Sequence, residues 1–138
     1  MNLDAVMDEV AGKLEPVPGL RVTANPADKV YPPHAVVSLP EITFDEMYGR
    51  GGDRFTLPVV LAVGKVIDRA ARKKLAPYVA GTGPKSLKQA LEGTDAAPQE
   101  YESCDSLRVQ SISFDTYAWG AIEYLVAIFT LDIAGDGA

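Results

Sequence analysis

IEYLVAIFTLDI, residues 122–133, is the stretch that decides the fold class. Its apolar residues follow one another directly instead of alternating with polar ones, so both faces of the strand that they form must be covered. Such a strand lies in the middle of a sheet. The stretch therefore predicts a central strand in a sheet that has other elements packed on it.

A second long strand precedes this stretch. Leu107 and Val109 share one parity, whereas Ile112 and Phe114 share the other, which predicts a β-bulge near residues 110–111. The four residues YAWG, 117–120, separate the two strands. We expect them to form the turn of a hairpin.

Three further strands are expected earlier in the chain, at Leu20–Thr23, His34–Phe44 and about Phe55–Val66. The third alternates apolar and other residues at period two. Pro58 interrupts it and removes a ladder hydrogen bond, which predicts an edge or a bulge there.

The first helix is predicted from apolar residues that recur on one face of a 3.6-residue period. Asn2 is its expected N-cap, and Pro16 and Pro18 end it. The apolar face consists of Leu3, Val6, Met7, Val10 and Leu14.

Two more helices are expected between the third and fourth strands. Asp68 is predicted to cap the longer one, residues 69 to about 79, in which Pro77 produces a kink or an early end. Pro84 is expected to open the shorter one, and Gly93 to close it.

These elements give the order α-β-β-β-α-α-β-β and an α+β fold. We expect a mixed or antiparallel sheet of about five strands, with the N-terminal helix and the two central helices packed on it. No internal repeat or second domain is visible, so residues 1–138 are expected to form a single domain.

Composition restricts the partners of the chain. With 13 Lys and Arg against 19 Asp and Glu, the net charge of −6 disfavours binding to nucleic acid phosphates or to an anionic membrane surface. The first residues are acidic and amphipathic, unlike a signal peptide, and no apolar run approaches the length of a membrane span. We expect a protein that folds in the cytoplasm and has no membrane partner.

The residues whose side chains could act in catalysis or bind a metal form no recognised catalytic pattern. GTGPKS, residues 81–86, is superficially similar to a phosphate-binding loop, but its spacing is short and it follows a helix, so we predict a turn. His34, the single histidine, has no companion ligands for zinc and is expected at the surface or half-buried at a strand end. Cys104 is expected to be an ordinary free thiol in a polar linker. We predict no catalytic, cofactor-binding or metal site.

The connection DEMYGRGGDR, residues 45–54, is long for a hairpin loop and contains three glycines. An anion site at Arg50 and Arg54 is one interpretation, and a plain flexible tip is another. We favour a loop that becomes ordered against a neighbouring molecule.

The order of short motifs resembles the tail terminator proteins of long-tailed phages that infect actinobacteria, also known as tail-completion or head-to-tail joining proteins. The resemblance spans residues 3 to about 133. It lies in P-A-D, P-P before an apolar strand, L-P-E-I-T-F, Y-G-R-G, V-G-K-V, D-R-A-A-R and G-T-G-P-K-S, in this order. None of these motifs is catalytic.

The resemblance implies a structural virion protein and no enzyme. Such proteins form a ring, usually of six subunits, at the head-proximal end of the tail tube. The ring stops tube polymerisation and joins the tail to neck or connector proteins at the tail–neck junction of the virion, after assembly in the host cytoplasm. DNA would pass through its lumen without specific binding, and an acidic wall suits that passage.

A cyclic ring needs two different complementary surfaces on each subunit. We expect a basic surface on the second helix, an acidic surface in the linker after the third helix, and a loop that reaches a neighbour or the tube. The candidate residues are Asp45, Glu46, Met47, Tyr48, Arg50, Asp53 and Arg54 in the loop, Arg69, Arg72 and Lys73 on the helix, and Glu100, Glu102 and Asp105 in the linker.

Two alternatives stay open. One is another phage neck or tail-assembly component on a similar scaffold, since one fold hosts many roles. The other is a small enzyme that binds a phosphate or a nucleotide through residues 81–86 or the glycine-rich loop.

Overall fold

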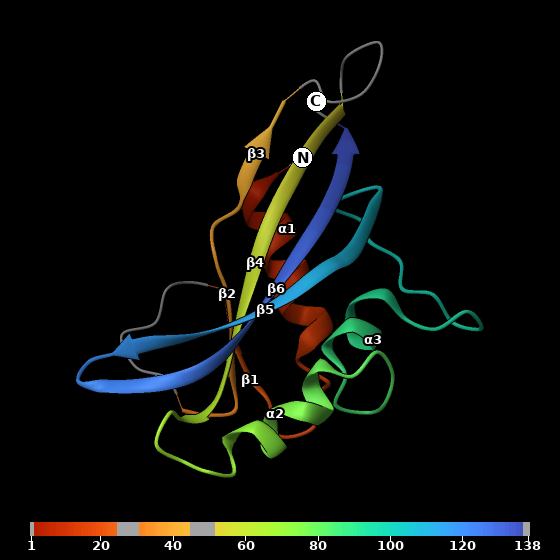
Figure 1. The fold of residues 1–138 in the computed structure, drawn as a ribbon. Coiled ribbons are helices and arrows are strands. Elements are labelled where there is room, and N and C mark those ends of the chain that lie inside the picture. The colour runs from red at the N-terminus through yellow and green to blue at the C-terminus, as the bar shows by residue number, and fades with distance from the viewer. Residues whose placement is uncertain (1, 25–30, 45–51, 137–138) are drawn as a thin grey trace.

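The computed structural model describes residues 2–24, 31–44 and 52–136. Figure 1 shows an α+β fold, as predicted, with the order α-β-β-β-β-α-α-β-β. The elements are α1 (Leu3–Leu14), β1 (Arg21–Thr23), β2 (His34–Val37), β3 (Glu41–Thr43), β4 (Gly52–Lys65), α2 (Ala71–Val79), α3 (Leu87–Glu92), β5 (Ser106–Trp119) and β6 (Ile122–Asp136).

The strands form one mixed sheet in the order β1-β2-β4-β6-β5, and β3 pairs with β4 further along the side that β2 occupies. β1 runs parallel to β2, while the remaining pairs are antiparallel. β6 lies between β4 and β5. The central strand predicted from residues 122–133 is therefore confirmed.

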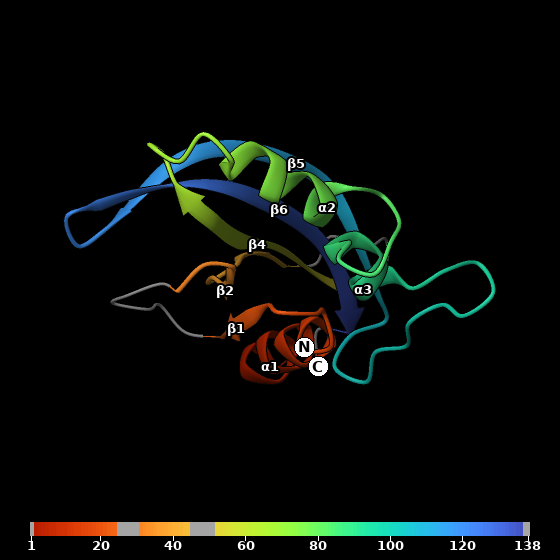
Figure 2. The same cartoon turned by 90° about the horizontal axis from the view of Figure 1, so that it is seen from below.

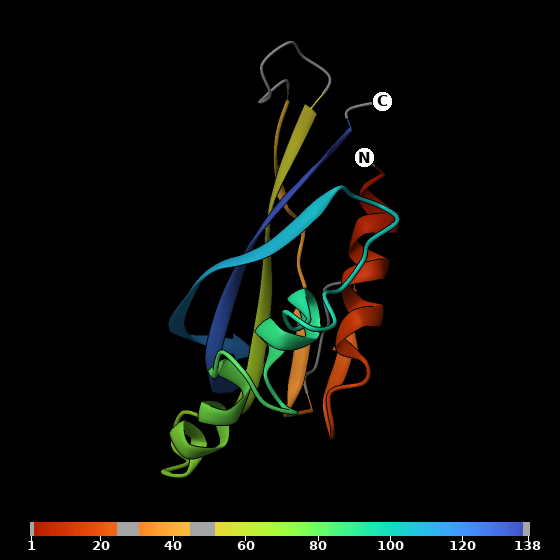
Figure 3. The same cartoon turned by 90° about the vertical axis from the view of Figure 1, so that its right-hand side faces the viewer.

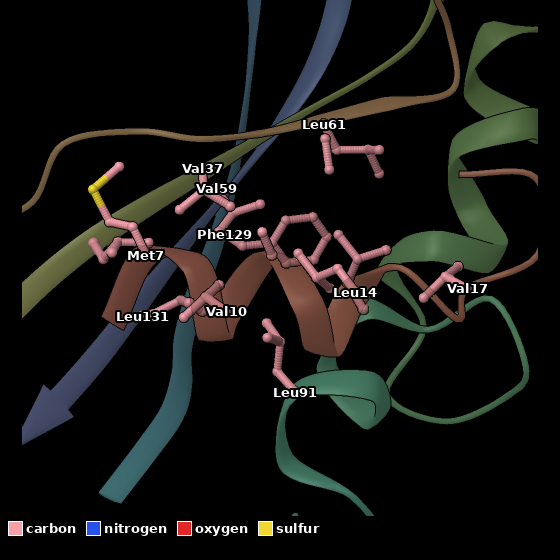
Figure 4. Close-up of a cluster of buried hydrophobic side chains, with 14 of the residues drawn as sticks. Met7, Val10, Leu14, Val17, Val37, Val59, Leu61, Leu91, Phe129 and Leu131 are labelled. Atoms are coloured by element: carbon pink, nitrogen blue, oxygen red, sulfur yellow. The ribbon is translucent and has the colours of Figure 1, made fainter. Parts of the chain in front are cut away.

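Helix α1 packs lengthwise on one face of the sheet (Figure 3). The side chain of Asn2 accepts a hydrogen bond from the backbone N–H of Ala5 at 3.1 Å, so the predicted N-cap is confirmed. Val10 and Leu14 are fully buried and meet Phe129 and Leu131 of β6 in the core (Figure 4). Each such side chain contributes about 1.5–3 kcal/mol by leaving water.

Helices α2 and α3 complete the same layer near the far end of β4 (Figure 2). Leu75 and Tyr78 of α2, and Leu87 and Leu91 of α3, belong to the same apolar cluster as α1. All three helices thus cover one face of the sheet.

The opposite face carries a second, smaller apolar cluster built from strands. Its buried members are Val36, Val60, Ala62, Tyr124 and Val126, and none of the three helices contributes a residue to it. We call this side the open face. The side chains of β6 therefore alternate between two apolar environments, which explains why the stretch reads as apolar throughout.

The expected strand from residue 34 to 44 is two strands, so the sheet has six strands instead of five. Three residues, 38–40, lie opposite two residues of β4, Leu57 and Pro58. Pro58 has no N–H to donate to this side, so the ladder is interrupted between β2 and β3. Of the two alternatives predicted for Pro58, the edge is wrong, because β4 is paired with β6 here and the Pro58 carbonyl accepts a hydrogen bond from Ser38 N at 3.0 Å on the other side. The bulge is supported by the extra residue opposite Leu57 and Pro58.

Helix starts also differ from the prediction. α2 begins at Ala71 because Asp68 forms a turn instead, with its side chain accepting from Ala70 N at 2.9 Å. Pro77 lies within α2 and does not end it early. α3 begins after Pro84, with Ser86 as its N-cap, and ends at Gly93 as expected.

The last hairpin has its turn one step later than expected. Residues 117–119 belong to β5, Trp119 pairs with Ile122, and Gly120 takes the positive φ of 65° that the two-residue turn requires. The predicted bulge is confirmed, because the register shifts between Val109 and Ser111.

Candidate interaction surfaces

The basic surface lies on α2 and on the turn before it. Arg69, Arg72 and Lys73 are exposed, as predicted. Lys74 donates to the carboxylate of Asp68 at 2.9 Å. This bond, together with the Ala70 N–H, lowers the pKa of Asp68. The pair fixes the turn that presents the three exposed cations.

The acidic surface lies in the segment between α3 and β5, which runs alongside α1. Glu100, Glu102 and Asp105 are exposed, as predicted. The carboxylate of Glu9 holds the segment by accepting from the backbone N–H groups of Glu102 at 3.0 Å and Ser103 at 2.9 Å, and from the Ser103 hydroxyl. Partial burial works to raise the pKa of Glu9, but these hydrogen bonds lower it overall.

Glu9 was not among the predicted residues. In the sequence it is one of several acids on the polar side of the first helix, and its partners are more than 90 positions away. Its role is to position the backbone that carries the acidic side chains, since its hydrogen bonds tie the middle of that segment to α1, beside the contact of Lys13 with the ring of Tyr101.

The predicted loop from residue 45 to 54 is shorter than expected. β4 begins at Gly52, so Asp53 and Arg54 are strand residues, paired in register with Gly135 and Ala134 of β6. Pairing with β6 outweighs the low strand preference of Gly52 and Asp53, and β3 adds pairing on the other side of β4 from Arg54 onward. The remaining candidates, Asp45, Glu46, Met47, Tyr48 and Arg50, lie outside the described residues.

Asp53 and Arg54 therefore do not belong to a flexible loop tip, because both lie in β4. Asp53 is buried. Arg54 forms an ion pair with Asp132 of β6, with 3.1 Å between Nε and Oδ1, and Arg108 of β5 approaches the other oxygen of the same carboxylate at 3.4 Å. These charges link three neighbouring strands across the open face.

Beyond the helices, β5 and β6 continue as a hairpin that we call the arm, residues 112–127 (Figures 1 and 2). On its helix-bearing face, Phe114 is 57% exposed. On its open face, the ring of Trp119 contacts those of Tyr117 and Tyr124, with centroids 5.9 and 5.8 Å apart. The aromatic contacts join both strands of the arm, and they leave apolar surface at its exterior.

The outer edge of β5 changes character along its length. Near its start, the backbone N–H of Val109 donates to the Glu92 carboxylate of α3 at 2.9 Å. Further along, the N–H of Thr116 donates to the side chain of Asp115 at 2.8 Å. Among the described strands, β5 pairs with β6 alone.

The arm was missed as a surface during sequence analysis. Its signal is SISFDTYAW, residues 111–119, which is rich in aromatic and β-branched residues and contains neither proline nor lysine. Those absences distinguish an edge that is open to pairing from one that is protected against it.

His34 stands at the start of β2, as expected, but it is buried instead of exposed or half-buried. Its Nδ1 accepts from the backbone N–H of Tyr31 at 3.3 Å, which leaves Nε2 to donate to the hydroxyl of Thr23 at 3.2 Å. Burial, and then the charge of Arg21, lowers the pKa of His34. The neutral imidazole fastens β2 to β1.

Cys104 is a free thiol in the linker between α3 and β5, as expected, but its side chain is buried in the main apolar cluster. Burial, with Glu9 and Asp105 nearby, raises its pKa to about 11. A thiol with this pKa is a poor nucleophile near neutral pH.

Residues 81–86 connect α2 to α3, as the predicted turn. Ser86 donates its hydroxyl hydrogen to Ala80 O at 2.6 Å and accepts from Gln89 N at 3.1 Å. Gly83 N donates to the Gln89 side chain at 3.1 Å. The polar groups of this turn are thus engaged in closing it.

Within the ranges that the structure describes, no three His, Cys, Asp or Glu side chains lie close enough together to hold a metal ion. No helix in those ranges has the length and apolar character needed to cross a membrane. The chain matches no protein-family model and no curated protein.

Proposed function

We propose that this chain is a ring-forming structural protein at the tail–neck junction of a long-tailed phage. It closes the head-proximal end of the tail tube, stops tube polymerisation and joins the tail to the neck or connector proteins. The proposal rests on the resemblance to tail terminators and extends it to particular surfaces.

The observation that carries the proposal is the separation of opposite charges. The exposed cations of α2 lie at the end of the molecule where β4 finishes, whereas the acidic segment runs beside α1 (Figures 1 and 3). Two different surfaces of opposite sign on different sides of a subunit favour a heterologous contact, and repeated heterologous contacts close into a ring.

Electron microscopy of particles from the source phage with this gene disrupted tests the proposal. Overlong tail tubes together with unattached heads are the expected result. Tails of normal length with unattached heads would instead favour another neck component, and wild-type particles would refute both roles. Complementation with the wild-type gene is the control, because it must restore tail length and head attachment together.

A second candidate, a small phosphate- or nucleotide-binding enzyme, has weaker support. Ser86 and Gln89 are occupied within the 81–86 turn, and Pro84 supplies no N–H donor there. Calorimetric titration with a nucleoside triphosphate distinguishes the two, since the structural role predicts no heat of binding.

A further inference from the structure

The arm has a backbone edge that is open beyond the bulge. In an antiparallel ladder, residues alternate between those that bond to the neighbouring strand and those whose N–H and C=O point away from it. Thr116 N points away from β6, because it donates to Asp115. By this alternation Ile112, Phe114 and Ala118 also direct their backbone groups to the outer edge.

The turn supports this assignment independently. Trp119 and Ile122 flank the two-residue turn and pair with each other, which makes 119, 117, 115 and 113 the residues bonded to β6. Glu123, opposite Ala118, turns its carbonyl toward β4 and accepts from Val66 N at 3.0 Å. Both observations place the even-numbered residues of β5 at the outer edge.

The usual protections of an edge strand are concentrated in the first part of β5; beyond it, the Asp115 carboxylate accepts from one outward N–H, that of Thr116, and would have to release it on pairing. The bulge at residues 109–111 and the Glu92 side chain cover the edge up to Val109. Residues 111–119 contain one charged residue, Asp115, and neither proline nor lysine. A long edge of this kind is a template for pairing with another strand.

We propose that the arm pairs edge to edge with the arm of a second copy, β5 against β5, in antiparallel orientation. The other outer strands, β1 and β3, have three residues each, whereas β5 offers its whole segment from residue 112 to 119. Strand pairing between identical edges generates a two-fold contact, which is the commonest symmetry of protein dimers.

Charge selects the register. A two-fold axis at Asp115 would put the two Asp115 carboxylates directly opposite each other, which is destabilising. An axis at Phe114 would extend the pairing to the bulged residue 110, next to the part of the edge that Glu92 covers. An axis at Thr116 avoids both problems: it sets Asp115 opposite Tyr117 of the second copy, and Phe114 opposite Ala118.

This contact is separate from the ring contact. A two-fold contact closes on two copies, whereas the proposed ring uses the α2 cations and the acidic segment in a heterologous contact. The arm residues take no part in those charged surfaces. The arm pairing can therefore fail while the ring still forms, and the ring can fail while the arms still pair.

Thr116→Pro tests the pairing, with Thr116→Val as the matched control. Proline removes an N–H that points away from β6, so the ladder between β5 and β6 keeps its bonds, whereas valine retains the N–H. We expect sedimentation over a wide range of concentration to give Thr116→Pro half the mass of the wild type and Thr116→Val the full mass. Circular dichroism and the melting temperature check that each variant folds.

The proposal would be overturned by a wild-type protein that stays monomeric throughout, or by an assembly that Thr116→Pro leaves intact. Cross-linking tests the register without disturbing the strand. In a Cys104→Ala background, Thr116→Cys should oxidise to a covalent dimer faster than Phe114→Cys, because residue 116 faces its own copy across the axis. Faster cross-linking of Phe114→Cys would contradict the pairing as proposed.

Discussion

At the scale of single residues, His34 links stability to pH. Its ring is buried and neutral, with Nδ1 facing an N–H donor that a protonated ring could not accept from. The lowered pKa means that the unfolded chain takes up the proton at a higher pH than the folded chain. Folding stability is therefore complete above the unfolded pKa of about 6.5 and is lost as pH falls through the lower, folded value.

We predict that the free energy of unfolding decreases between about pH 7.5 and pH 5.5, and that His34→Gln removes most of this decrease. Glutamine can accept and donate but does not titrate in this range. Urea denaturation at both pH values measures the effect. Glu9 and Asp68 also have lowered pKa values, but the ordinary pKa values of these groups are 4.5 and 3.8, so their contribution is lost at lower pH. An equal decrease in the variant would exclude His34 as the source.

At the scale of elements, the charge of each of the two surfaces can be reversed by substitution. Arg72→Glu with Lys73→Glu reverses the α2 surface while leaving Lys74 and its bond to Asp68 in place. We predict that this variant loses assembly because acidic surfaces then meet. Native mass spectrometry or sedimentation gives the readout.

The matched control for that exchange is a second reversal on the acidic segment. Glu100→Lys with Glu102→Lys leaves the Glu102 backbone N–H that Glu9 binds. Mixing this variant with the α2 variant places opposite charges face to face again at one interface. Recovered assembly in the mixture identifies these surfaces as partners, whereas no recovery removes them from the ring contact.

The periodicity of apolar residues in the sequence was sufficient to predict most helices and strands. The apolar spacing from Leu3 to Leu14, and the parity change between Val109 and Ile112, identified a helix and a bulge that the structure confirms. Local chemistry was less reliable at boundaries. Asp68 and Pro84 have the residue types of helix starts, yet the Asp68 turn and the Ser86 N-cap place the starts at Ala71 and Leu87.

Long-range features escaped prediction for a definite reason. Pro58 of β4 lies opposite residues 38–40, between β2 and β3, and that adjacency has no local signal in the sequence. The same holds for Glu9, whose partners are fixed by the packing of the segment against α1. His34 is buried because β1 and the residues before β2 close around it. Each case depends on neighbours that are distant in sequence.

At the scale of the whole molecule, the two proposed contacts respond differently to salt. The ring contact joins exposed charges, whose attraction is screened over about 10 Å at 0.1 M ionic strength and over less at higher salt. The arm contact consists of backbone hydrogen bonds and apolar side chains. We predict that raising the salt concentration dissociates the ring while arm pairing persists.

Mass photometry across a salt series checks this prediction, with Thr116→Pro as the companion sample. The wild type should fall to a two-copy species at high salt, and Thr116→Pro to single copies. An assembly that is insensitive to salt in both samples would show that the charged surfaces do not hold it together.

The packing of α1 against β6 also governs how the chain can fold during synthesis. Leu14 and Val10, made first, find their buried neighbours Phe129 and Leu131 only when the last strand has left the ribosome. β4 likewise waits for β6, its longest partner. Such non-local contacts slow folding and prolong the exposure of apolar segments. The nascent chain cannot form its native core until β6 has emerged, so we expect its dependence on chaperones to be greatest just before β6 leaves the ribosome.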